Sequence, residues 1–244
     1  MVKQLQQAFF ATFRPRSGAV PFFTSVVVWG IGIGCFAASV NNYLVDVHDL
    51  NQFQRGLLEF FRELPGLLLV FLLALLHRTS DWQILRIGTL TSMVGVIALC
   101  VPANLVAATL LNMVWSTGEH LAMPVRSAIA MQIARENRSG ASLGCVTAAM
   151  HAGLVFGNLL VAAIFMVGLR VFGLTDRARL YNVVWAVIFL LMAASLACTL
   201  SRQAPRIPSR RPRLLLRRKF GLFYALELFY GARKQIFLTF GPFV

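Results

Sequence analysis

Charge is what this sequence has least of, and acidic charge above all. Charged residues make up 13% of the 244 residues, and 9 of them are Asp or Glu against 23 Lys or Arg. Ordinary soluble domains contain about 25% charged residues, whereas apolar residues reach 58% of this chain. The shortage of charge excludes an ordinary soluble domain and indicates a membrane protein.

Motifs of metal and redox chemistry are also missing. The four cysteines have no Cys-x-x-Cys spacing, and His-Glu-x-x-His is absent. We therefore expect free apolar thiols rather than disulfides or metal ligands, and we predict no cofactor. An intramembrane enzyme built on the pair Glu119-His120 is the weakest of the functions considered.

Long apolar runs are what the sequence has in abundance. Crossing a bilayer core about 30 Å thick takes about 20 mostly apolar helical residues. Seven runs approach or exceed this length: 20–44, 57–76, 84–101, 105–133, 143–171, 180–200 and 220–244. We predict an all-α polytopic membrane protein, in which 1–201 form a six-helix transmembrane bundle, 202–219 a basic linker and 220–244 one extra transmembrane helix.

Basic residues are concentrated in alternate loops. If the N-terminus is cytoplasmic, that side of the membrane collects 15 Lys or Arg and the other side 5. The positive-inside rule therefore favours a multi-pass protein of the cell membrane with its N-terminus inside. Eight of the basic residues lie between Arg202 and Lys219. A basic run beside a membrane is attracted to anionic lipid, so we expect the bilayer rather than nucleic acid as its partner.

Small residues predict how the helices pack. Lipid tails are as apolar as leucine, so helices in a bilayer associate where small residues let their backbones approach closely. The spacing Gly-x-x-x-Gly occurs three times, and we expect a packing face at each: Gly30 and Gly34, Gly140 and Gly144, Gly153 and Gly157.

Two segments resemble helices of transporters of the major facilitator superfamily. Arg138-Ser-Gly-Ala-Ser-Leu-Gly followed by Gly153-Leu-Val-Phe-Gly-Asn is similar to the fifth helix of that family, and Gly118-Glu-His-Leu-Ala-Met-Pro-Val-Arg resembles the fourth. The loop from His77 to Arg86 departs from the family's usual motif. The resemblance implies the first six helices of a secondary transporter plus the seventh, apparently truncated. It also implies that the first, fourth and seventh helices line the transport path, and that the partner is a C-terminal half or a second copy.

Polar residues inside the apolar runs mark the candidate site. An ionisable group at membrane depth costs about 3 kcal/mol or more, so such groups normally face a cavity or a partner. Glu119 and His120 lie in the middle of the fourth run, and residues spaced by three or four place Asn112, Trp115, Met123 and Arg126 on the face of Glu119. Other runs complete the predicted proton and substrate path with His151, Asn158, Asn41, Asn42, Glu227, Arg233 and Lys234.

This path predicts proton-coupled transport of a small polar or charged solute. A carboxyl group in a cavity of low dielectric can load and release a proton as its exposure alternates. Glu119 is the candidate carrier, and Arg126 could pair with it or hold an anionic solute. Two alternatives stay open. Glu119 and Arg126 could form a structural ion pair, or the chain could be a non-transporting remnant or oligomeric scaffold, because half of a two-bundle transporter cannot alternate access alone.

Several further residues are expected at the membrane surface. Arg62 and Glu63 open the second run, where long side chains can extend to the headgroups, so an anchor is favoured over a gate. Trp29, Trp82 and Tyr181 are candidates for the aromatic belt that lines membrane interfaces.

The predicted orientation can be tested by thiol labelling. Single cysteines placed at Asn51 and Ser209 in a cysteine-free background should lie on opposite sides of the membrane. A membrane-impermeant maleimide added to intact cells should label the first, and should label the second only after the cells are opened. The reverse pattern would contradict the orientation.

Overall fold

The computed structural model describes residues 9–15, 17–101, 104–200, 217–226 and 229. Within these ranges the secondary structure is helical, and no β-strand is present beyond one isolated bridge. The helices are α2 (Ala19–His48), α3 (Gln52–Leu67), α4 (Leu69–Leu75), α5 (Asp81–Ala98), α6 (Leu105–Ile133), α7 (Ser139–Arg170), α8 (Arg177–Thr199) and the 3-10 helix η1 (Arg218–Phe220).

Three of the described helices are long and apolar enough to cross a membrane, namely α2, α7 and α8. This confirms the helical fold class, and by length and composition the three helices are compatible with a membrane protein. Six expected apolar runs coincide with helices, the second of them with α3 and α4 together. Residues 202–216 of the predicted linker 202–219 lie outside the described residues, as does most of the seventh run, 220–244. A six-plus-one transmembrane bundle and its division into domains therefore stay predictions.

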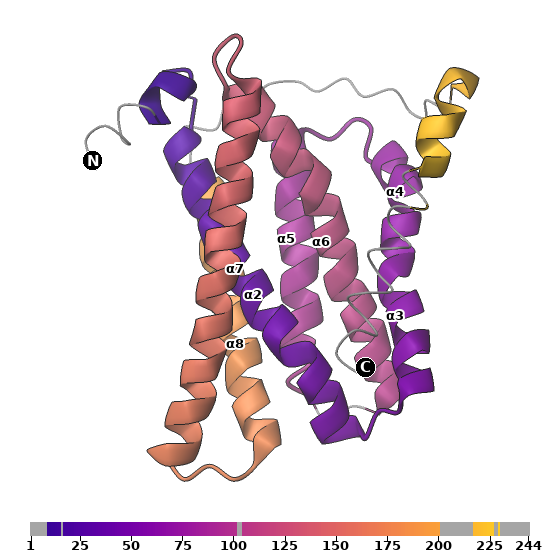
Figure 1. Cartoon of the computed structure of the whole chain (residues 1–244), viewed down its shortest axis with the longest axis vertical. Helices are drawn as coiled ribbons and strands as arrows, with labels where there is room; N and C mark the ends of the chain where they lie inside the picture. Colours follow the sequence, from indigo (N-terminus) through magenta and orange to yellow (C-terminus); the bar gives the residue numbers. More distant parts are fainter. Residues whose placement is uncertain (1–8, 16, 102–103, 201–216, 227–228, 230–244) are drawn as a thin grey trace.

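The second run is broken, which the sequence analysis did not predict. Helix α3 ends at Leu67 and α4 begins at Leu69. Pro65 lies in the last turn of α3, where it lacks an N–H and its ring crowds the preceding turn. Gly66 follows it and lowers the helical propensity further. Figure 1 shows α3 and α4 along α6, on the side of α6 away from α7.

Two of the three glycine pairs do form packing faces, between α2 and α7. A Cβ added to Gly30 would lie 2.7 Å from the carbonyl oxygen of Met150, and one added to Gly153 would lie 2.6 Å from that of Val27. Cβ atoms essentially never approach oxygen so closely, so only glycine permits this contact. Figure 1 shows α2 and α7 crossing each other.

Among the described residues, the prediction for Gly140 and Gly144 is wrong. A Cβ added to either residue meets no described atom within 4 Å, because both glycines are exposed at the start of α7. The sequence analysis missed another pair of glycines, which forms a close contact between α5 and α6. Gly88 of α5 and Gly118 of α6 face each other, and a Cβ on Gly88 would lie 2.7 Å from the carbonyl oxygen of Gly118.

Aromatic side chains fill the centre of the bundle. Trp29, Trp115, Trp185 and Tyr181 are fully buried, and Trp82 is 6% exposed. Phe36 of α2 stacks on Trp115 of α6 with ring centroids 4.2 Å apart. Neighbouring helices cover Trp29, Trp82 and Tyr181, so these side chains do not form a lipid-facing belt within this bundle. Their position at the depth of the membrane interface stays a prediction. All four cysteines are free in the structure, and Cys35 is buried.

The segment before α2 is tied to the end of α6 by main-chain hydrogen bonds. The N–H of Arg14 donates to the carbonyl of Ile133 at 3.0 Å, and the N–H of Arg135 donates to that of Thr12 at 2.9 Å. The Nε atoms of both arginines also donate to main-chain carbonyls of the opposite segment. Phe13 and Ala134 thereby form the isolated antiparallel bridge.

The close contact of α2 and α7 can be tested with two matched substitutions. Gly157→Ala places a methyl group against the backbone carbonyl of Ile31, whereas the methyl group of Gly144→Ala meets no atom of the described residues. Overpacking costs about 1–3 kcal/mol, so the first variant should unfold at a temperature several degrees below the second in detergent micelles. Equal unfolding temperatures would contradict the packing described here.

Candidate functional site

Helix α6 carries the central part of the predicted path, and its residues are covered unequally. Asn112 is 1% exposed, Trp115 is fully buried and Arg126 is 6% exposed, while Glu119 and His120 are half-buried. Met123 is 54% exposed, although it shares their helical face. Helical spacing sets the direction of a side chain, but the crossing helices decide which directions are covered.

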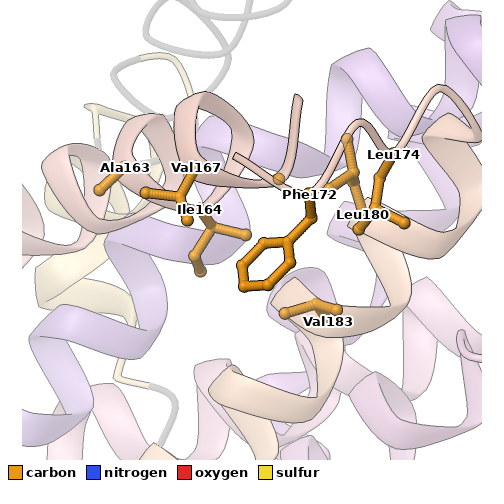
Figure 2. Close-up of a pocket in the computed structure, with 8 residues that line it drawn as sticks. Ala163, Ile164, Val167, Phe172, Leu174, Leu180 and Val183 are labelled. Atoms are coloured by element: carbon orange, nitrogen blue, oxygen red, sulfur yellow. The ribbon is translucent and has the colours of Figure 1, made fainter. Parts of the chain in front are cut away.

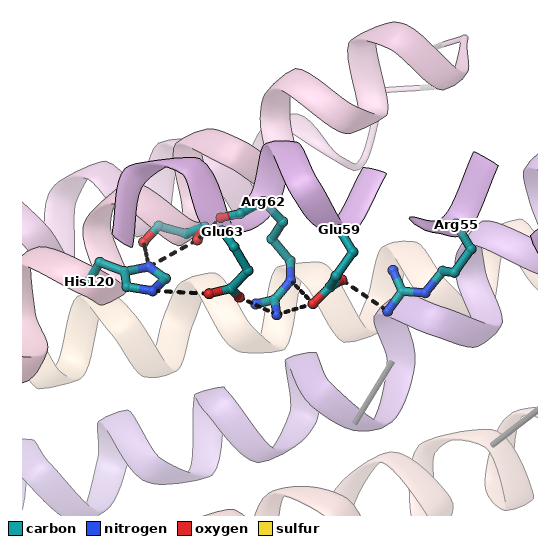
Figure 3. A network of polar contacts seen from close by, with 6 residues as sticks. Arg55, Glu59, Arg62, Glu63 and His120 are labelled. Atoms are coloured by element: carbon teal, nitrogen blue, oxygen red, sulfur yellow. Dashed lines mark hydrogen bonds and ion pairs between the residues drawn. The ribbon is translucent and has the colours of Figure 1, made fainter. Parts of the chain in front are cut away.

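A chain of ionisable side chains joins α3 to α6 (Figure 3). Glu59 lies between two arginines. Its carboxylate is 3.2 Å from Nη2 of Arg55 and accepts a hydrogen bond of 3.0 Å from Nε of Arg62. Arg62 also contacts Glu63, with Nη2 2.5 Å from Oε1, and Oε2 of Glu63 is 3.5 Å from Nε2 of His120. Five ionisable groups from two helices thus form one continuous line.

His120 is held in a fixed orientation at the end of this line. Its Nδ1 is 2.9 Å from the main-chain carbonyl of Ser116, which can only accept, so Nδ1 carries a hydrogen. The hydroxyl of Ser116 donates to the main-chain carbonyl of Arg62 at 2.5 Å and fixes α6 against α3. Gly66 makes room for the ring, because a Cβ there would lie 2.6 Å from Nε2. The atom of His120 that gains or loses a proton is therefore Nε2, which faces Glu63.

Arg126 lies in a separate, mostly apolar environment. Its guanidinium carbon is 4.5 Å from the centre of the Trp29 ring, a cation–π contact, and Nη1 donates to the sulfur of Met150 at 3.5 Å. The structural alternative required an ion pair between Arg126 and Glu119, and no such pair is present among the described residues. Instead the charge of Glu119 acts on Arg62, His120 and Arg126 without contacting them.

The other predicted residues that the structure describes do not gather around α6. His151 and Asn158 are exposed on α7, and Nδ1 of His151 donates to the carbonyl of Thr147 at 2.8 Å. Asn41 is half-buried and Asn42 is exposed near the end of α2. Glu227, Arg233 and Lys234 lie outside the described residues.

Sequence reasoning missed the part of the site that lies on α3. Arg55 and Glu59 were not singled out, and Arg62 and Glu63 were expected at the membrane surface. Their spacing could have revealed them, because residues 55, 59, 62 and 63 lie on one face of a helix and alternate in charge sign between Arg and Glu at 55, 59 and 62. Arg55 and Glu59 are buried, which excludes a headgroup anchor for these two residues.

One further motif also escaped the sequence analysis. Gly140-Ala-Ser142-Leu-Gly144 has the spacing Gly-x-Ser-x-Gly of a hydrolase nucleophile. Ser142 is buried in the first turns of α7, and its hydroxyl donates to the carbonyl of Ala130 at 2.7 Å. A nucleophile of this kind needs an exposed strand-to-helix turn and an adjacent base. The hydroxyl instead joins α7 to α6.

An apolar hollow of about 430 Å³ lies between the end of α7 and the start of α8 (Figure 2). Ile164, Val167, Phe172, Leu180 and Val183 are among the side chains that line it. A wall of carbon atoms offers a polar solute no hydrogen bond, so this hollow is not the candidate site. Within the described ranges, no group of His, Cys, Asp and Glu is placed to hold a metal ion.

Comparison with known proteins identifies no relative. No protein-family model matches the sequence, and no curated protein matches it. The resemblance to the major facilitator superfamily therefore stays a prediction that rests on the residues quoted above.

The central position of Glu59 predicts that the line of charges stabilises the fold. Glu59→Gln leaves Arg55 and Arg62 without the charge they share, and breaking a buried ion pair costs about 3–5 kcal/mol. Arg179→Gln breaks an exposed pair with Asp176, which contributes about 1 kcal/mol or less. Urea unfolding in micelles should show a much larger loss for the first variant. Similar losses would mean that the line is solvated.

Proposed function

We propose that this chain forms the proton-handling bundle of a secondary transporter that moves a small polar or charged solute across the cell membrane. The observation that carries the proposal is the contact of His120 with Glu63, at the end of a line of charges that is buried at Arg55 and Glu59 and half-buried at the other residues. The line joins α3 to α6 in a bundle that contains three helices apolar enough to cross a membrane. Ionisable groups at membrane depth are expensive, and they mark solute and proton paths.

The charges along the line favour binding and release of one proton. Arg55, Glu59, Arg62 and Glu63 balance each other, so the line is neutral while His120 is neutral. A proton on Nε2 adds one positive charge, which faces the carboxylate of Glu63 and is attracted by Glu119. Glu119 precedes His120 on α6, is half-buried and forms no ion pair among the described residues, so we propose it as the second proton site. The proton sites are therefore Nε2 of His120 and the carboxyl group of Glu119.

The proposed architecture is a bundle of six transmembrane helices with a cytoplasmic N-terminus, followed by a seventh helix, as in the major facilitator superfamily. Six apolar runs that coincide with helices support it, as does the excess of basic residues in alternate loops. Alternating access takes two bundles that rock against each other. The proposal therefore includes a second bundle, supplied by a further segment or by a second copy of this chain.

Transport driven by a pH gradient tests this function. Proteoliposomes with an imposed inward proton gradient are given radiolabelled lactate, alanine, glucose or choline, which represent an anion, a zwitterion, a neutral solute and a cation. At least one should accumulate, and a protonophore should abolish the accumulation. Glu119→Gln should lose this dependence on the gradient because the amide cannot carry a proton, whereas Glu136→Gln, at an exposed loop residue, should retain it.

Two outcomes would contradict the proposal. Accumulation by Glu119→Gln that matches the unmodified protein across the pH range would exclude Glu119 as a proton carrier. If none of the four solutes accumulates under the gradient, the non-transporting scaffold becomes the better interpretation.

A further inference from the structure

Arg126 has hydrogen-bonding capacity that the surrounding helices leave unused. The residue is 6% exposed, and only Nη1 has an acceptor, the sulfur of Met150. Nε and Nη2 are buried and have no hydrogen-bond partner among the described residues. Buried polar groups are nearly always hydrogen-bonded, so two such donors on one charged group need an explanation.

The two unused donors lie on the same edge of the guanidinium group. Nε–H and one N–H of Nη2 point in parallel, with the spacing of the two oxygens of a carboxylate or phosphate, which they bind as a fork. The third nitrogen is only weakly engaged, because a thioether sulfur is a poor acceptor on a flexible side chain. The free edge thus matches an oxyanion in number and direction of donors.

The electrostatics of the site favour the same ligand. A buried cation without a partner is strongly destabilising, and the Trp29 ring compensates only part of that cost. Glu119 is seven residues away on the same helix, a rise of roughly 10 Å, so it attracts the guanidinium without contacting it. An anion on the Nε–Nη2 edge would supply the missing negative charge.

We propose that Arg126 binds the oxyanion of the transported solute, a small organic molecule with one carboxylate or phosphate group. The inference rests on the proposed transport function and adds its substrate class. The site lies where Trp29 of α2, Arg126 of α6 and Met150 of α7 meet. The edge is buried in this conformation, so the solute reaches it when the helices around Arg126 part.

Direct binding to the purified protein tests the inference. Benzoate, phenyl phosphate, benzamide and benzylamine share one ring and differ in the group it carries. Titration calorimetry in micelles should show benzoate or phenyl phosphate binding at least about tenfold more tightly than benzamide, as a charge-assisted fork requires. The stronger of the two anions identifies the oxyanion. Benzylamine should show no binding.

Variants of Arg126 assign the binding to this residue. Arg126→Gln should weaken anion binding by about tenfold or more, and Arg126→Lys should recover part of it, because the charge returns without the fork. Arg78→Gln removes a basic residue from an exposed loop and should leave binding unchanged. If Arg126→Gln does not fold, the comparison of the four probes on the unmodified protein and the Arg126→Lys variant decides the matter.

The results separate this inference from the transport proposal. Equal affinity for benzoate, phenyl phosphate and benzamide, or unchanged anion binding by Arg126→Gln or Arg126→Lys, would overturn the anion site. Gradient-driven accumulation of glucose or choline without anion binding would overturn it and leave a proton-coupled transporter. Anion binding that depends on Arg126, without accumulation of any solute, would support the site and contradict transport.

Discussion

The arrangement of this molecule depends on the close approach of α2 to α7, which glycine alone permits. At Gly30 the backbone of α2 lies against the main-chain carbonyl of Met150. The residue before that glycine is Trp29, so the same contact brings the indole of α2 and the thioether of α7 to one place. Arg126 of α6 occupies that place. A larger residue at position 30 would push the two helices apart. Trp29 and Met150 would then no longer both contact the Arg126 guanidinium.

A second close approach, between α3 and α6, brings His120 to Glu63. Gly66 lets α3 come near enough to α6 for His120 to meet Glu63, and the Ser116 hydroxyl holds the two backbones together there. Helix α6 therefore presents different chemistry to its two sides. On the side toward α3, His120 of α6 ends a line of alternating charges. On the side toward α2 and α7, Arg126 of α6 lies against the Trp29 ring and the Met150 sulfur. Glu119 lies between the two and acts on both.

The sequence predicted those features that depend on one helix at a time. Apolar runs gave the positions of six helices, and Gly-x-x-x-Gly gave the contact surface of α2 and of α7. Features that depend on which helices are neighbours could not be predicted. Gly140 and Gly144 have the same spacing but face no helix, and Trp29 looks like a residue of the membrane interface until α6 is known to cover it. Arg55 and Glu59 were missed for the same reason, because their burial comes from helices distant in sequence.

The main-chain bridge between Phe13 and Ala134 has a mechanical consequence. It joins the chain just before α2 to the residue just after α6, so the two helices are fastened together at one end of the bundle. Any change in the angle between them must turn about that end, and the displacement grows with distance along the helices. Trp29 and Arg126 lie in the halves of the two helices nearer the bridge, so they move apart less than the far halves, which carry Phe36 and Trp115.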